Sequence, residues 1–306
     1  MSNMIKKITT FIFFTFLSFN GYASNALYTP YEGLDFKYRW LDTAKHDTHA
    51  IEISGLHTST PHQFGYEFQQ ILGDDTLTKL GLTYAYKAGS HWAGFGLSSN
   101  SDKPLTSLNL IDFDVFYAFK VFQHVTEYEN INGKALAYYS RLYLGLEYST
   151  NRLFLDGYPL PVIRYEYSKP GLDVIFGLPL TYIKVDFLKY SSIEFKYVPI
   201  LDIFFSYNLG INKNNMLQFQ AEMENDMYKL SNMVKDVYFS EQEKYYTDTV
   251  SIRFRYSVTI KDTVRISPFI EFIADSHRYN SKEIKLFSNS STGIGYSAGI
   301  NITAFF

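Results

Sequence analysis

The sequence predicts an all-β fold, a transmembrane antiparallel up-and-down β-barrel of 12–14 strands, with 14 favoured. Three observations predict it: a short N-terminal segment typical of export, long runs that alternate between apolar and polar residues, and a final alternating run that ends in Phe306. The 306 residues include 27 Tyr and 27 Phe. Aromatic residues favour strands and the boundary between water and lipid, so the composition agrees with this fold.

Charge and cysteine content exclude several classes of protein. The formal net charge is −3, which lacks the basic excess expected of a nucleic-acid binder, so no nucleic-acid partner is expected. The chain has no cysteine, and therefore neither a disulfide framework nor a thiolate nucleophile or metal ligand. No motif for a cofactor is present, and we expect none.

The first residues have the layout of a cleavable secretory signal. Lys6 and Lys7 precede an apolar run over 8–19, which is too short to cross a bilayer as a helix. Small residues follow, and they favour cleavage after Ala23, with Ala26 as the second choice; an uncleaved anchor is the alternative. We therefore expect a signal peptide over 1–23 and a single barrel domain over 24–306.

The remainder of the chain alternates with a period of two. In the first predicted strand, Leu34, Phe36 and Trp40 share one face, while Lys37 and Arg39 lie on the other. The same pattern predicts strands over 33–41, 48–57, 62–72, 78–87, 90–98, 106–121, 136–149, 158–168, 172–185, 191–209, 215–229, 247–260, 263–276 and 293–306.

Alternation also fits a soluble β-sandwich, but the length of the runs favours a membrane barrel. Many runs exceed the 5 or 6 residues that are common in globular strands and reach the ~9–11 that a tilted transmembrane strand needs. Some polar faces carry two charges per strand, which suits a water-filled interior better than the face of a sandwich.

The connections provide a second test, because short and long joins alternate in such barrels. Tight turns are predicted at 59–61, 88–89, 169–171, 210–214 and 261–262, and longer joins at 99–105, 150–157, 230–246 and 277–292. Residues 122–135 do not fit this alternation, since they would form a long join at the end where the other joins are tight turns. Pro199 is a further difficulty, because it cannot donate to a ladder within the predicted strand 191–209, and a turn there would change the count.

The last strand resembles the signal by which the outer-membrane assembly machinery recognises its barrel substrates. The alternating residues of this signal are Ile300, Ile302, Ala304 and Phe306. The resemblance implies a place in the bacterial outer membrane, with membrane lipid and the assembly machinery as partners.

A second resemblance covers Leu160 to Leu209. The residues that carry it are the Tyr-Ser-Lys-Pro-Gly turn at 167–171, Phe-Gly-Leu-Pro at 176–179 and Tyr-Val-Pro at 197–199. This stretch resembles a group of porin-like outer-membrane barrels of unknown function. The resemblance implies a fold and a location but transfers no functional residues.

The polar faces predict a passive, porin-like channel for small hydrophilic solutes, and no enzymatic activity. The candidate pore-lining residues are Lys37, Arg39, Arg141, Glu147, Arg164, Glu166, Glu222, Glu224, Arg253, Arg255, Arg265 and Glu271. Arg253, Arg255 and Arg265 form a basic stripe beside Glu222 and Glu224. Such charges either set up a field across the pore or pair as salt bridges, and pairing is the more ordinary outcome.

Other interpretations remain. A structural or adhesive barrel would bind a partner through 230–246 and 277–292. A lipid-modifying enzyme would need a serine and histidine pair, for which the nearest match is His57-Thr58-Ser59-Thr60, in a predicted periplasmic turn.

His46 and His49 flank Asp47, a weak pattern for a metal site, and no metal is expected there. Several aromatic residues near strand ends are interpreted as an interfacial girdle: Trp40, Trp92, Tyr148, Tyr197 and Tyr256.

Overall fold

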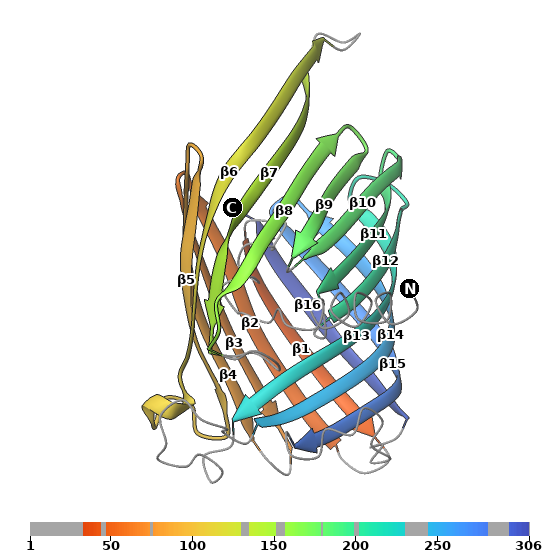
Figure 1. Cartoon of the computed structure of the whole chain (residues 1–306). Coiled ribbons are helices and arrows are strands. Elements are labelled where there is room, and N and C mark those ends of the chain that lie inside the picture. Colours follow the sequence, from red (N-terminus) through yellow and green to blue (C-terminus); the bar gives the residue numbers. More distant parts are fainter. Residues whose placement is uncertain are drawn as a thin grey trace, which may run out of the picture.

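The computed structural model describes residues 33–43, 47–73, 76–129, 135–150, 157–178, 180–198, 202–229, 244–280 and 294–305. These residues form one closed antiparallel barrel (Figure 1). Its strands are β1 Gly33–Thr43, β2 Asp47–Ser59, β3 His62–Leu72, β4 Leu77–Ala88, β5 His91–Ser101, β6 Asp112–Glu129, β7 Ala135–Ser149, β8 Leu160–Lys169, β9 Leu172–Leu178, β10 Thr181–Leu188, β11 Ser191–Val198, β12 Asp202–Gly210, β13 Asn215–Lys229, β14 Lys244–Ile260, β15 Val264–Asn280 and β16 Gly295–Phe305. A short 3-10 helix, η1 Leu108–Leu110, precedes β6.

The barrel is of the up-and-down type, because each strand pairs with its neighbours in the sequence. It closes where β1 meets β16, with Gly33 opposite Phe305 and Thr43 opposite Gly295. The expectation of a closed antiparallel barrel is therefore confirmed. Among the described residues, no helix is long and apolar enough to cross a membrane, a result that does not bear on strands.

The described residues form 16 strands, and both the favoured 14 and the range of 12–14 were wrong. Two predicted strands are each divided. The stretch 172–185 separates into β9 and β10 around Pro179, and 191–209 separates into β11 and β12 around Pro199. Both prolines fall outside the bounds of the strands, and a proline has no N–H to donate to a ladder.

The join that did not fit, 122–135, is mostly strand. β6 continues to Glu129 and β7 begins at Ala135, with a register shift between Lys120 and Phe122. The pairing of β6 with β5 ends at Phe119, which lies opposite His91. β8 pairs with β7 only from Tyr139 onward. The two strands therefore continue past their neighbours as a two-stranded ribbon, which projects from the top of the barrel in Figure 1.

At one end of the barrel, where Gly33 and Phe305 also lie, every join between successive strands has five residues or fewer. The pairs Ser59–His62, Ala88–His91 and Lys169–Leu172 each close around two residues. Gly89 and Gly171 in these turns have positive φ, which glycine adopts without steric cost. We refer to this as the turn end and to the opposite one, where the longer joins lie, as the loop end.

The outer face is apolar. Large side chains that alternate along the strands are exposed there: Leu82, Phe95, Leu97, Val115, Leu144, Leu146, Ile163, Phe176, Phe205, Phe254 and Ile270. Contiguous apolar exposure on this scale is unfavourable in water and indicates a lipid-facing surface. The barrel is thus a transmembrane one.

Aromatic and histidine rings line the outer face near the turn end. The rings of His62 and Tyr84 lie 5.9 Å apart, and those of His91 and Phe119 lie 5.3 Å apart. Trp40 and Tyr256 are also exposed on the outer face, as the girdle interpretation requires. Rings of this kind are typical of the membrane–water boundary.

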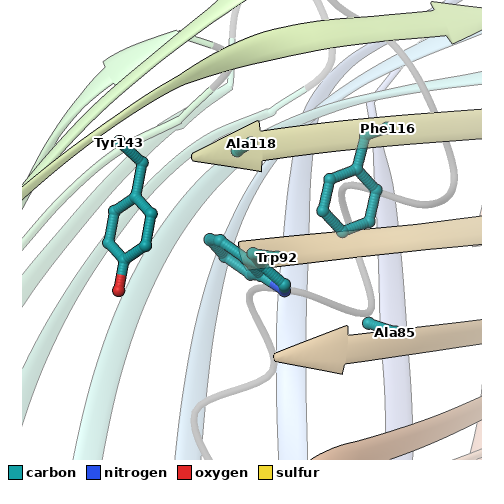
Figure 2. Packing of buried hydrophobic residues seen from close by; sticks show 5 residues of the cluster. All are labelled: Ala85, Trp92, Phe116, Ala118 and Tyr143. Atoms are coloured by element: carbon teal, nitrogen blue, oxygen red, sulfur yellow. The ribbon is translucent and has the colours of Figure 1, made fainter. Parts of the chain in front are cut away.

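Trp92 was wrongly placed in the girdle. It is 4% exposed and lies on the inner face, where it packs with Ala85, Phe116, Ala118 and Tyr143 (Figure 2). Its neighbours in sequence, His91 and Phe95, face outward, and the alternation of the strand decides its direction.

Two glycines of the wall lie in close contact with neighbouring groups beside this apolar cluster. A Cβ on Gly94 would lie 2.3 Å from the ring of Phe116, and one on Gly145 would lie 2.0 Å from the carbonyl oxygen of Tyr117. Neither position has room for a side chain. The wall is therefore closely packed at these two points of β4–β8, a region of the inner surface that we call the corner.

Candidate pore interior

The residues predicted to line a pore all lie on the inner face. Each occupies a strand position that alternates with exposed outward residues, and many of them contact one another. Glu147 is 3% exposed and lies opposite Leu160, and Glu224 lies opposite Asp202. Arg255 approaches the ring of Phe269, and Arg265 approaches that of Phe305.

Four of these residues form a connected chain of ion pairs, which we call the balanced chain: Arg39, Glu271, Arg253 and Glu222. Arg253 Nη2 lies 2.6 Å from Glu271 Oε1, and Arg253 Nη1 lies 3.6 Å from Glu222 Oε2. Arg39 Nη1 lies 3.6 Å from Glu271 Oε2. Two arginines thus face two glutamates, so the charges cancel. For Arg253 the salt-bridge interpretation fits better than the field across the pore.

Lys37 and Lys79 each form an ion pair with a glutamate. Lys37 Nζ lies 3.3 Å from Glu52 Oε2, and Lys79 Nζ lies 3.0 Å from Glu67 Oε1. Two lysines therefore accompany two carboxylates in this part of the inner face.

The corner lined by β4–β8 differs. We call its charged residues the cationic corner: Lys87, Arg141, Arg164 and Glu166. Arg164 Nε donates to Glu166 Oε1 at 2.7 Å. Lys87 Nζ lies 4.0 Å from Glu166 Oε1, and Arg141 Nη1 lies 4.0 Å from Glu166 Oε2. Three cations therefore surround one carboxylate.

Aromatic rings fix the position of the lysine in this corner. Lys87 Nζ lies 4.4 Å from the centre of the Trp92 ring and 5.0 Å from that of Tyr143. Arg164 lies 5.0 Å from the same Trp92 ring. Cations are attracted to ring faces, which helps to hold like charges close together.

The loop end contains a contact that the sequence analysis did not predict. Lys229, the last residue of β13, pairs in a parallel sense with Ser101, the last residue of β5. Lys229 also forms an ion pair with Asp112 on β6, and the two side chains are 7% and 2% exposed. In Figure 1, β13 sweeps across the lower part of the barrel toward β5.

The strands between β5 and β13 end before this level. β6 begins at Asp112, opposite Ser98, whereas β5 continues to Ser101. β12 begins at Asp202, opposite Glu224, whereas β13 continues to Lys229. The perimeter of the loop end therefore passes directly from β13 to β5 and is narrower than that of the full barrel.

The residues considered for metal binding or catalysis are not assembled into such a site. His49 Nδ1 lies 2.9 Å from the hydroxyl of Tyr38 on the exposed surface, and His46 lies outside the described residues. Over the part of the chain that is described, no group of three or more His, Asp or Glu could hold a metal ion. His57 and Ser59 are exposed, and Ser59 is the last residue before a tight turn.

The C-terminal strand forms as the alternation predicts. Ile300, Ile302 and Ala304 alternate in β16 with Gly299, Asn301 and Thr303, of which Thr303 is buried. Phe306 lies outside the described residues. The role of these residues as an assembly signal stays a prediction.

Comparison with known proteins yields loose structural likenesses. A scan against protein-family models finds no match, and a search of curated proteins also finds none. Among solved structures, the NanC porin covers 89% of this chain and 100% of its own at 8% identity, with a TM-score of 0.32. The KdgM porin in complex with disordered oligogalacturonate covers 89% and 99% at 10% identity, with a TM-score of 0.29. The toluene transporter TodX of Pseudomonas putida covers 94% and 92% at 8% identity, with a TM-score of 0.32.

Proposed function

We propose that this chain forms a porin-like channel in the bacterial outer membrane, through which small hydrophilic solutes diffuse passively. One observation carries the proposal: the charged side chains gather on the inner face of a closed 16-strand barrel whose outer face is apolar. Barrels of 16 or more strands are too wide for side chains to fill, and their interior holds water. A polar lining then allows hydrated solutes to pass.

The connections support an orientation in the membrane. Short turns and both strand ends at Gly33 and Phe305 lie at one end, as at the periplasmic end of outer-membrane barrels. At the other end, which we assign to the cell exterior, β5 and β13 end and the chain continues into the longer stretches 102–111 and 230–243. A signal segment over 1–23 would deliver the chain to the periplasm; these residues lie outside the described part.

Planar-bilayer recording with the purified full-length protein tests the proposal. We expect discrete conductance steps in KCl, and swelling of proteoliposomes in arabinose but not in a large dextran. Protein that inserts and resists protease as a folded barrel, yet never conducts, would overturn the channel and favour a structural or adhesive barrel.

The lipid-modifying alternative is tested with the same preparation. We expect no release of fatty acid from phospholipid vesicles. Release that disappears in a Ser59→Ala variant would establish an enzyme instead.

A further inference from the structure

Among the ion pairs of the described inner face, those of the cationic corner join three cations to a single carboxylate. The balanced chain and the pairs of Lys37 and Lys79 match cations with carboxylates. The cationic corner instead holds Lys87, Arg141 and Arg164 around Glu166 alone. Lys120 adds a further cation nearby, since it lies opposite Tyr143 in the pairing of β6 with β7.

Of the three cations around Glu166, one lies within hydrogen-bond distance of the carboxylate and two lie farther away. Its contact with Arg164 is a 2.7 Å hydrogen bond between two side chains that are each 8% exposed. Lys87 and Arg141 stay 4.0 Å away, at the outer limit of an ion pair. A charge-assisted hydrogen bond to a carboxylate is normally ~2.7–2.9 Å long, so both groups keep donor capacity for another acceptor.

These two cations are also the accessible ones. The side chains of Lys87 and Arg141 are 34% and 29% exposed, whereas that of Arg164 is 8% exposed. An anion that enters the barrel therefore meets the ammonium group of Lys87 and the guanidinium group of Arg141. The buried pair of Arg164 and Glu166 lies beneath these two groups.

We propose that the cationic corner is a binding site for small organic oxyanions, carboxylates or phosphate esters, which bind between Lys87 and Arg141. The inference rests on the proposed channel and names the solutes that it favours. The bound oxyanion would offset the excess positive charge that Glu166 leaves. Confined cations of this kind lower the barrier for anions and raise it for cations.

Tryptophan fluorescence measures this binding without requiring conductance. The chain has two tryptophans, and a Trp40→Phe variant leaves Trp92, whose ring lies 4.4 Å from Lys87 Nζ. We expect gluconate and glucose 6-phosphate to cause a saturable fluorescence change in the folded, detergent-solubilised protein, and glucose to cause none. Titration calorimetry on the unmodified chain provides a second readout. No saturable signal and no binding heat with either anion would overturn the site.

Matched variants locate the site. Lys87→Gln and Arg141→Gln should each weaken gluconate binding at least tenfold, and the double variant should abolish it. Lys79→Gln is the control, because Lys79 lies on the same strand and inner face but is paired with Glu67 at 3.0 Å. This control should bind within twofold of the unmodified protein. An equal loss in all three single variants would mean a diffuse charge effect and would overturn the assignment to this corner.

Bilayer recording then links the site to transport. In a KCl gradient the reversal potential should indicate preference for chloride, and gluconate should reduce the current with the same dependence on Lys87 and Arg141. A silent protein that still binds gluconate would contradict the channel but not the site. A conducting protein that binds neither anion would contradict the site but not the channel.

Discussion

Lys229 on β13 forms a buried ion pair with Asp112 on β6 at the loop end of the barrel. The strands β5 and β13 meet beside this pair, although they are as far apart in the order of the ring as two strands can be. Seven strands separate them in either direction around the ring. The pair therefore connects strands that are distant in the order of the ring but adjacent at the loop end. It narrows the loop end, which we assign to the cell exterior.

Asp112→Asn should widen the channel. Without the carboxylate, Lys229 remains as an uncompensated buried charge, and β13 should separate from β5. Removal of one partner from a buried ion pair costs about 3–5 kcal/mol, so the urea midpoint should fall as well. Single-channel conductance should rise above that of the unmodified protein.

Two variants control this experiment. Asp262→Asn breaks the pair between Lys213 and Asp262, which is exposed at the turn end, and should leave conductance unchanged. A double variant, Asp112→Lys with Lys229→Asp, should restore the original conductance in part. Unchanged conductance in Asp112→Asn would mean that this contact does not set the width of the permeation path.

Ile270→Arg tests the lipid-facing assignment of the outer face. Ile270 is 63% exposed in the middle part of β15, and an arginine at the bilayer midplane of such a barrel costs about 2–4 kcal/mol. Tyr296→Arg is the control, since Tyr296 is 66% exposed but lies next to the end of β16, where the cost falls to about 0–1 kcal/mol. Unfolding in lipid vesicles measures both. Equal costs at the two positions would contradict the assigned depth.

Gly145→Ala should strain the corner of β4–β8. The added Cβ would lie 2.0 Å from the carbonyl oxygen of Tyr117, so the strands must shift, and overpacking of this kind costs about 1–3 kcal/mol. Leu146→Ala is the matched control on the outer face of the same strand, where the side chain is 60% exposed. If Gly145→Ala unfolds at the same urea concentration as the unmodified protein, the close approach is not a constraint.

Much of the fold could be predicted because the alternation of apolar and polar residues with a period of two indicates which face of a strand contacts lipid. The prediction that Lys37 and Arg39 face inward, opposite Phe36 and Trp40, follows from that pattern alone. The number of strands was underestimated where the pattern is weakest. β9 to β12 have only 7 to 9 residues each, and alternation continues across Pro179 and Pro199, so pairs of strands read as single ones.

The candidate site was predictable only in part. Arg141, Arg164 and Glu166 were expected on the inner face, but their excess of charge depends on Lys87, which comes from a strand three removed from β7 in the ring. The pairing of Asp112 with Lys229 spans 117 positions, and no local pattern reports it. Trp92 is the reverse case: the alternation of its own strand predicts the inner face, whereas the preference of tryptophan for interfaces wrongly predicts the outer one.

The ribbon formed by the far ends of β6 and β7 should be dispensable for the barrel. Beyond Lys120 its residues have no partner on β5, and β8 pairs with β7 only from Tyr139. Replacement of residues 126–138 by Asn-Gly joins Val125 to Tyr139, which already lie opposite each other, through a two-residue turn that hairpins favour. We expect a folded barrel with unchanged conductance, measured by protease resistance and bilayer recording. A deletion of the same length over 257–269 is the control, because those residues pair within the wall with β13 and β16 as well as with each other, and it should prevent folding. Loss of folding in the shortened variant would show that the ribbon is needed to assemble the wall, although it extends beyond its pairing with β5 and β8.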